Sequence, residues 1–447
     1  MRRLTVMVAA VSLLAAAPVV PTAQSPRTAT IDAFVTDREG KPILGLADGD
    51  FRVVTADGKT IPVTGVREVT IPLAARGKAT AVAEAPLEAT NRHAADARLF
   101  VVVAEPVASD PGRRPTREFM DELVAGMRDV DQLALFVPGH PDRSLPPTDD
   151  TTLIARALDR FFELGAGDTG GLTSFMRYDM PKVYRSLMAM RWTQRAIVLL
   201  TPGYVGPEGF YDEKSWAAWA QRANAPMHGV DVVGGARSMG LRLLPKATDE
   251  TGGLLLNSQP AMPGLASKIL SASSHFYEVQ IEIPANVKTD QSIYTSVRTH
   301  PTSKTRARLR VRAPEPLELS VHATNELKTA LAAALPMDEI PLSFSLESTI
   351  GATAATVKFL TNGTTDPRSA ELPEFPFRMA FGAVTDAGKM QEIGVRDVGP
   401  EDVKIEGCCM AIQHDVVIPK DATSVRVAVY QHPTGKVGAV FIPVIRN

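Results

Sequence analysis

The sequence predicts an α/β fold class: a doubly wound, mainly parallel sheet flanked by a small N-terminal β module and a C-terminal all-β sandwich-like domain. Continuous apolar runs alternate with helical periodicity between residues 98 and 257. Alternating strands precede that region, and short strands separated by turn residues follow it. The predicted parts are an N-terminal β module at 28–88, a central domain with closing strands at 96–313, and a C-terminal β domain at 317–447.

The first 25 residues have the features of a cleaved secretory signal. Arg2 and Arg3 form a positive start, Leu4 to Val20 is almost wholly apolar, and a polar exit begins at Gln24. The apolar run is short for a membrane-spanning helix, and a retained anchor is the alternative. We expect an exported protein, periplasmic or extracellular, with no membrane span in the mature chain.

Composition narrows the classes of partner. A net charge of −2 over 447 residues lacks the basic surplus that nucleic-acid binding requires. Cys408 and Cys409 are adjacent, so a disulfide between them cannot close a long loop. Two thiols also cannot complete a structural zinc site. We expect no disulfide framework, and we expect one of the two cysteines to pack in a strand. The oligomeric state is left open.

In the N-terminal module, short alternating segments predict strands. Thr30–Thr36 places its apolar residues on one face, and Phe51–Val54 is a second strand. Asp57-Gly58 favours a hairpin turn, and Val63–Ile71 holds further short strands. Thr80–Arg92 is rich in Ala and polar residues without a clear period, which predicts a linker.

In the central domain, continuous apolar runs predict strands buried on both faces, and apolar residues recurring every three or four positions predict helices. Thr116 and Asp150 are expected N-caps. The predicted strands are Leu99–Val103, Gln132–Val137, Ala196–Thr201, Met227–Val233 and Leu254–Asn257. The predicted helices are Thr116–Arg128, Asp150–Leu164, Tyr178–Met190, Glu213–Asn224 and a short one near Leu241–Thr251.

From Ser274 onward the pattern is again that of strands. Phe276–Ile283 and Arg306–Val311 are expected to close the central domain, and the basic residues of Lys304–Arg312 are expected on a solvated face rather than at an anion site. Seven short strands then predict a sandwich or barrel-like domain. These are Leu342–Leu346, Thr356–Phe359, Phe377–Val384, Val403–Ile405, His414–Ile418, Ser424–Tyr430 and Val437–Ile445.

Several short motifs occur in a fixed order over residues 30–313. They are Val35-Thr36-Asp37, Gly40, Gly45-Leu46, Asp50-Phe51, Asp57-Gly58-Lys59, Glu250-Thr251-Gly252-Gly253, Ser273–Tyr277 and the basic strand Arg306–Arg312. In this order they resemble the VWFA-related, acidobacterial-type exported proteins, which contain a von Willebrand factor A-like domain. The resemblance implies a metal-ion-dependent adhesion site at the carboxyl end of the sheet, with an Asp-x-Ser-x-Ser motif, a later Thr and a second Asp holding Mg²⁺ or Ca²⁺.

That motif is degenerate in this chain. The window after Val103 is Ala104–Ala108 and lacks its ligands, and Pro202 stands where the second Asp is expected. Thr173 matches the loop Thr of the family. The other candidate oxygen donors are Ser109, Asp110 and Glu105. We expect no cofactor, and Mg²⁺ or Ca²⁺ only if an altered site survives.

The predicted function is an exported, non-enzymatic protein-binding or envelope module. Its contacts are expected from loops at the carboxyl edge of the sheet, which contain His140, Asp142 and Tyr204. One alternative is a cation-dependent adhesin that uses the altered metal site. A second is an uncharacterised enzyme in the crevice around His140, although the chain has no Gly-x-Ser-x-Gly or His-Glu-x-x-His motif.

Overall fold

A computed structural model gives the structure of the chain. It describes residues 27–55, 57–73, 87–91, 93–94, 96–106, 110–165, 172–190, 194–201, 219–220, 223–233, 248, 251–257, 264–284, 293–298, 300, 303–310, 322–349, 352–359, 377–406, 409–432 and 434–444. The predicted signal segment lies outside these residues, as does most of the predicted helix Glu213–Asn224. Within the described ranges, no helix is long and apolar enough to cross a membrane.

The predicted fold class is wrong. Four of the five sheets formed by the described residues contain only antiparallel pairs. Strands also outnumber helices in this part of the chain. The protein is therefore mostly β, and it is not an α/β protein organised around a doubly wound sheet of the von Willebrand factor A type. The β–α alternation of residues 98–257 occupies a minority of the chain, and most strands lie outside it.

Parallel pairing occurs in one six-stranded sheet, in the order β11-β10-β9-β6-β7-β8. Its last pair, β7 with β8, is antiparallel. Every residue of β6 and β9 is buried, as expected for continuous apolar strands whose two faces are both covered. The strands are β6 Arg98–Ala104, β7 Gln132–Phe136, β8 Leu145–Thr148, β9 Gln194–Thr201, β10 Met227–Asp231 and β11 Leu255–Asn257.

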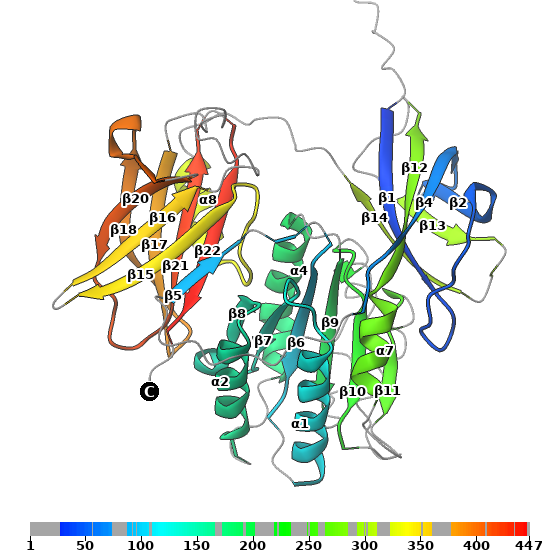
Figure 1. Ribbon diagram of the computed structural model, residues 1–447, viewed down its shortest axis with the longest axis horizontal. Helices are drawn as coiled ribbons and strands as arrows, with labels where there is room; N and C mark the ends of the chain where they lie inside the picture. Colours follow the sequence, from blue (N-terminus) through cyan, green and yellow to red (C-terminus); the bar gives the residue numbers. More distant parts are fainter. Residues whose placement is uncertain are drawn as a thin grey trace, which may run out of the picture.

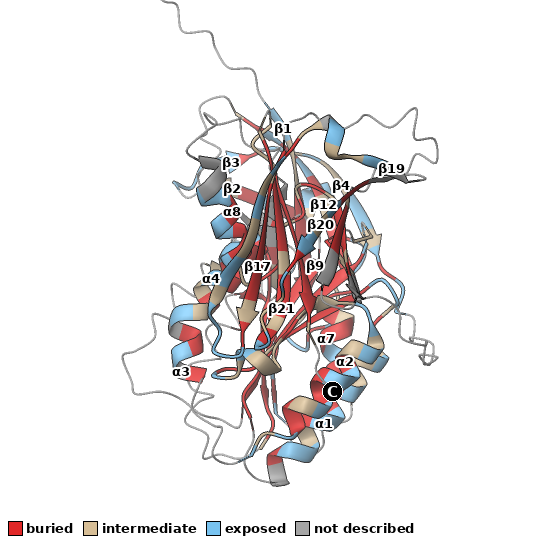
Figure 2. Ribbon diagram, turned by 90° about the vertical axis from the view of Figure 1, so that its left-hand side faces the viewer, coloured by how far each residue is buried: buried red, intermediate tan, exposed pale blue. Residues whose placement is uncertain are grey.

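Helices pack on both faces of this central sheet. Phe100 and Val102 of β6 contact one group of helices, and Leu99 and Val101 contact the other, because successive side chains of a strand point to opposite faces. Figure 2 shows the buried inner faces and exposed outer faces of α1 and α2. The first group is α1 Asp110–Ala125, α2 Thr151–Phe162 and α7 Leu265–Ala272; the second is α3 Leu172–Ser174, a π-helical turn Phe175–Asp179 and α4 Met180–Ala189.

The two predicted N-caps have different outcomes. The Asp150 carboxylate accepts a hydrogen bond from the Thr152 N–H at 2.7 Å, so the predicted cap of α2 is confirmed. Helix α1 begins at Asp110, earlier than predicted. Thr116 therefore lies inside α1, and its hydroxyl donates to the Gly112 carbonyl at 2.7 Å instead of capping the helix.

The N-terminal module is completed by strands from residues 275–310. β1 pairs with β12 and with β14, and β2 pairs with β13. The sequence assigned these strands to the central domain, whereas their backbone hydrogen bonds are made with residues 27–70. Figure 1 shows β12 and β14 beside β1. The strands are β1 Arg27–Thr36, β2 Phe51–Thr55, β3 Thr60–Ile61, β4 Val63–Thr70, β12 His275–Ile283, β13 Ile293–Val297 and β14 Lys304–Arg310, with a 3₁₀ turn η1 at Asp48–Asp50.

The C-terminal domain consists of two antiparallel sheets that enclose an apolar core. All seven predicted strands are present, and β18, whose polar sequence gave little signal, is additional. Helix α8 covers the outer face of one sheet. The elements are α8 His322–Ala332, β15 Leu342–Thr349, β16 Ala352–Phe359, β17 Phe377–Thr385, β18 Met390–Val398, η6 Pro400–Asp402, β19 Lys404–Glu406, β20 Cys409–Val416, β21 Ala422–Gln431 and β22 Val437–Pro443.

One strand of this domain comes from the segment of the chain that precedes the central domain. β5, Leu87–Thr90, pairs antiparallel with β15 and forms the edge of the sheet β19-β20-β16-β15-β5. Figure 1 shows β5 among the strands of the C-terminal domain. The sequence placed these residues in the N-terminal module or a linker, whereas they pair with β15. The C-terminal domain is thus assembled from segments on both sides of the central domain.

Candidate functional site

The carboxyl ends of three neighbouring strands meet at one edge of the central sheet. β6, β9 and β10 are parallel and adjacent. Each ends at or just before a residue with a side-chain oxygen, namely Glu105, Thr201 and Asp231. Open parallel sheets present their ligand-binding groups at this edge, so these three side chains are the starting point for a site.

Glu105, Thr201 and Asp231 are all buried. Their side chains are 2%, 1% and 0% exposed, respectively. The Glu105 N–H donates to the Leu200 carbonyl at 3.1 Å, and the Thr201 hydroxyl lies 3.5 Å from Glu105 Oε2. Asp231 is the register partner of Thr201, and its Oδ1 accepts from the Val233 N–H at 3.1 Å. Two carboxylates therefore flank a threonine along the sheet edge.

Of the four predicted metal ligands, the structure places only the Glu105 side chain. Ser109 lies outside the described residues. Asp110 is the first residue of α1 and Thr173 lies in α3, but their side chains also fall outside the described part. Among the residues whose placement is described, no three His, Cys, Asp or Glu side chains are grouped as metal ligands. The carboxylate and hydroxyl oxygens of Glu105 and Thr201 are nevertheless donors of the kind that Mg²⁺ and Ca²⁺ accept.

The predicted partner-binding loop after β7 contacts the C-terminal domain. His140 precedes the short turn η2, Pro141–Arg143, and Asp142 forms an ion pair with Arg143 at 3.1 Å. A side-chain carbon added to Gly388, in the β17–β18 turn, would lie 3.1 Å from Pro141 Cγ. One side of the loop therefore packs against another part of the same chain. Tyr204, the third predicted contact residue, lies outside the described residues.

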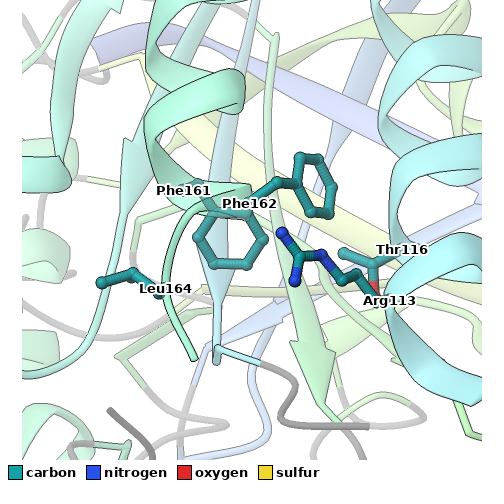
Figure 3. A pocket seen from close by; sticks show the side chains of 5 residues that line it. All are labelled: Arg113, Thr116, Phe161, Phe162 and Leu164. Carbon is teal, nitrogen blue, oxygen red and sulfur yellow. The ribbon is translucent and has the colours of Figure 1, made fainter. Parts of the chain in front are cut away.

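A hollow lies between α1 and α2, close to the same sheet edge, and sequence reasoning did not identify it. It is shallow and open to solvent. Figure 3 shows the Phe161 and Phe162 rings beside the Arg113 guanidinium, with Leu164 and Thr116 completing the wall. We call this hollow the α1–α2 notch. Arg113 is in the first turns of the helix that follows β6, and Leu164 follows the end of α2, which places the notch at the carboxyl edge.

The notch combines an apolar floor with a positively charged rim. The rings of Phe161 and Phe162 meet edge to face with centroids 5.0 Å apart. The Arg117 guanidinium stands 4.7 Å from the Phe162 ring centroid, and it also pairs with Asp159 at 2.5 Å. Arg113 is exposed at the mouth. The adjacent residue pair Phe161-Phe162 was a signal for this feature, but the sequence alone could not show that α1 starts early enough to reach it.

Comparisons with known proteins give no assignment. No family model matches the chain. No curated protein matches it either. Among solved structures, the N-terminal domain of the TFIIH subunit p34 matches with 12% sequence identity and a TM-score of 0.27, over 39% of this chain and 98% of that chain. Because a likeness this weak supports no conclusion, the resemblance to the VWFA-related proteins stays a prediction.

Proposed function

We propose that this chain is an exported, non-enzymatic binding module that contacts a protein partner at the carboxyl edge of its central sheet. The α1–α2 notch is the observation that supports the proposal. It joins aromatic and aliphatic walls from Phe161, Phe162 and Leu164 to the exposed guanidinium of Arg113. Aromatic residues and arginine are enriched at protein interfaces and supply a large share of their binding energy.

The size of the notch favours a side chain of a protein over an independent small molecule. Pockets that bury a drug-sized ligand usually enclose several hundred Å³ or more, whereas this hollow is shallow and open to solvent. An apolar side chain of a partner would lie against the Phe161 and Phe162 rings rather than inside an enclosed pocket. An acidic residue next to it would then lie near Arg113, where charge-assisted hydrogen bonds form.

The loop after β7 contributes less to this proposal than the sequence suggested. His140 and Asp142 lie in a segment that packs against the β17–β18 turn. A partner that reached the central sheet there would have to share the loop with the C-terminal domain. The α1 side of the edge is therefore the favoured contact surface.

A pull-down from envelope extract with the mature chain tests the proposal. The variants Arg113→Glu and Leu164→Asp change the rim and the wall of the notch, and Arg156→Glu changes an exposed arginine elsewhere on α2. A partner retained by the wild type and Arg156→Glu should bind at least about tenfold more weakly to both notch variants. Equal retention by all four proteins would show that the notch is not the contact.

The second candidate function is cation-dependent binding at the same edge. It is favoured by the position of Glu105 and Asp231 on either side of Thr201. Isothermal titration with Mg²⁺, Ca²⁺ and Mn²⁺ tests it, using Glu105→Gln and Thr173→Ala, with the exposed Glu163→Gln as control. Stoichiometric binding that both site variants abolish would support an altered metal site. If no cation binds, or if all variants bind alike, this candidate is excluded.

The contacts of the His140 backbone order the turn that follows β7. The His140 N–H donates to the Val137 carbonyl, and the His140 carbonyl accepts from the Arg143 N–H and from the Ser144 hydroxyl, which lies 3.4 Å away. We propose no catalytic role for the imidazole.

A further inference from the structure

Three consecutive residues, Gly252, Gly253 and Leu254, each contact a different basic side chain where the N-terminal module meets the central sheet. Gly252 lies beside Arg306, with an added Cβ 3.4 Å from Arg306 Cβ and 4.0 Å from its Nη1. The Lys304 ammonium donates to the Gly253 carbonyl at 3.4 Å. The Leu254 N–H donates to His228 Nδ1 at 3.1 Å. The two cations of β14 and an imidazole of β10 therefore converge on one short segment.

Arg306 is a buried cation. It is 5% exposed, contrary to the solvated face that the alternating sequence predicted. Its guanidinium carbon lies 4.1 Å from the centroid of the Phe34 ring, a favourable cation–π distance. Among the described residues, its Nε–H has no hydrogen-bond acceptor. Burial lowers the pKa of Arg306 to about 9, so the group keeps its charge at neutral pH.

A buried arginine whose Nε–H has no acceptor is costly. A buried hydrogen-bond donor that has no acceptor costs about 1–3 kcal/mol of stability, and more when the donor is charged. Buried charges are therefore normally paired. The Phe34 ring offsets part of this cost, but its π face cannot accept the in-plane Nε–H as a carboxylate would. The Nε–H of Arg306 is therefore a buried donor that an anionic acceptor would satisfy.

His228 supplies a second donor next to the segment that Arg306 contacts. It is 1% exposed, and its Nδ1 accepts the Leu254 N–H, so the neutral ring carries its hydrogen on Nε2. Within the described part of the chain, Nε2 has no acceptor. Burial, followed by the positive charges of Arg306 and Lys304, lowers the pKa of His228 to about 3. The imidazole is therefore neutral and acts as a hydrogen-bond donor at physiological pH.

We propose that Arg306 and His228 bind a small oxyanion, a phosphate or a carboxylate, at the junction of the N-terminal module and the central sheet. The planar guanidinium offers N–H groups to two oxygens, and the His228 Nε2–H adds a neutral donor. Such an anion would supply the missing acceptors and would connect β14 of one domain to β10 of the other. This site is separate from the α1–α2 notch and does not depend on the function proposed for it.

Isothermal titration of the mature chain with inorganic phosphate and, separately, with acetate tests the proposal. Sodium chloride at equal ionic strength controls for general screening. Saturable binding of one oxyanion and a rise of a few degrees in Tm are expected, since a ligand that binds only the folded state stabilises it. The two titrations show whether phosphate or carboxylate is the preferred source of the oxyanion.

The variants Arg306→Lys and Arg306→Met decide whether Arg306 is the binding group, with the exposed Arg52→Met of the same module as the matched control. Arg52→Met should bind like the wild type. Arg306→Lys keeps the charge but loses the planar fork, and it should bind about tenfold or more weakly. If Arg306→Met does not fold, the affinity of Arg306→Lys compared with that of the wild type decides whether Arg306 binds the oxyanion. The absence of saturable binding to the wild type, or wild-type affinity in the folded Arg306 variants, would overturn the proposal.

Discussion

The Asp131 carboxylate holds the buried Arg98 guanidinium at the amino end of the central sheet. Arg98 Nη2 and Nε lie 2.6 Å and 3.0 Å from Asp131 Oδ2, and both side chains are at most 1% exposed. Arg98 also donates to the Leu270 carbonyl of α7 at 3.1 Å, and Arg128 donates to Asp131 at 2.9 Å. This network ties β6, the turn before β7 and helix α7 together.

We expect Asp131→Ala to destabilise the central domain by about 3–5 kcal/mol, because it leaves the Arg98 cation buried and unpaired. Urea unfolding followed by tryptophan fluorescence and circular dichroism measures the change. The exposed Asp121→Ala on α1 is the control and should change the free energy of unfolding by less than about 0.5 kcal/mol. A loss below about 1 kcal/mol in Asp131→Ala would contradict a structural role for the pair.

The same pair predicts a loss of stability in acid. Burial opposes ionisation of Asp131, but hydrogen bonds from Arg98 and Arg128 outweigh it, and the pKa of Asp131 is lowered. Its stabilising contribution is present above about pH 3.9, the usual pKa of an unfolded aspartate, and is lost as the pH falls through the lower pKa of the folded state.

Unfolding free energies at several pH values between 7 and the acid range measure this effect. Asp131→Asn should show a shallower fall with decreasing pH than the wild type. The unfolding free energy of Asp131→Asn should still fall somewhat with decreasing pH, since the Gly45 N–H and His275 also lower the pKa of Glu68. Identical pH profiles for the two proteins would count against the assignment.

Glu122 of α1 caps the first turn of α7. Its carboxylate accepts from the Gly264 N–H at 3.0 Å, the Ser267 N–H at 3.2 Å and the Ser267 hydroxyl at 2.6 Å. Because Gly264 itself has no capping side chain, α1 provides the cap from a distance. We expect Glu122→Ala to cost about 1 kcal/mol, within the range of lost N-caps, and Glu122→Gln to cost less because an acceptor remains. Chemical denaturation provides the comparison, and equal losses in the two variants would argue against a role for the acceptor.

Asn91 fixes β5 to the C-terminal domain. It is 6% exposed, its amide nitrogen donates to the Met337 and Ile340 carbonyls at 2.6 Å and 2.8 Å, and its oxygen accepts the Leu342 N–H at 2.7 Å. Asn91→Ala leaves three backbone groups without these partners. We therefore expect a loss of about 1–3 kcal/mol and faster proteolysis of the segment that contains β5.

Thr60→Ala, at the exposed position of strand β3, serves as the control. It should leave the proteolysis rate near that of the wild type. If Asn91→Ala is cleaved no faster than Thr60→Ala, the amide does not anchor β5.

Local sequence patterns predicted many elements but not how they associate. The apolar runs Leu99–Val103 and Ala196–Thr201 are confirmed as β6 and β9, and Asp150 is confirmed as a cap, because each depends on neighbouring residues. The pairing of Ile31 with Val279 joins residues far apart in the chain, and a period-two pattern does not specify a partner strand. For this reason the predicted fold class was wrong, and the pairing of residues 275–310 with the N-terminal module was not predicted.

The candidate sites show the same limit. Glu105 could be found from its position after an apolar run, since the end of a parallel strand is a local feature. Arg306 belongs to a run in which basic residues alternate with small and apolar ones, and it was predicted to be solvated, yet it is buried beside Gly252 of the central domain. The α1–α2 notch depends on where two helices lie relative to each other, and no spacing within either helix specifies that.

Gly253 allows β10 and the segment before β11 to approach closely. A Cβ added to Gly253 would lie 1.9 Å from the Met227 carbonyl oxygen, a backbone atom that cannot rotate away. We expect Gly253→Ala to separate these segments, to weaken the Leu254 contact with His228, and to destabilise the chain by about 3 kcal/mol. Gly49→Ala is the control, because an added Cβ there has no atom within 4 Å. Chemical denaturation of both variants measures the change in stability, and phosphate titration of each variant that folds measures the change in binding. A Gly253→Ala protein as stable as Gly49→Ala would show that the two segments can move apart without loss of stability.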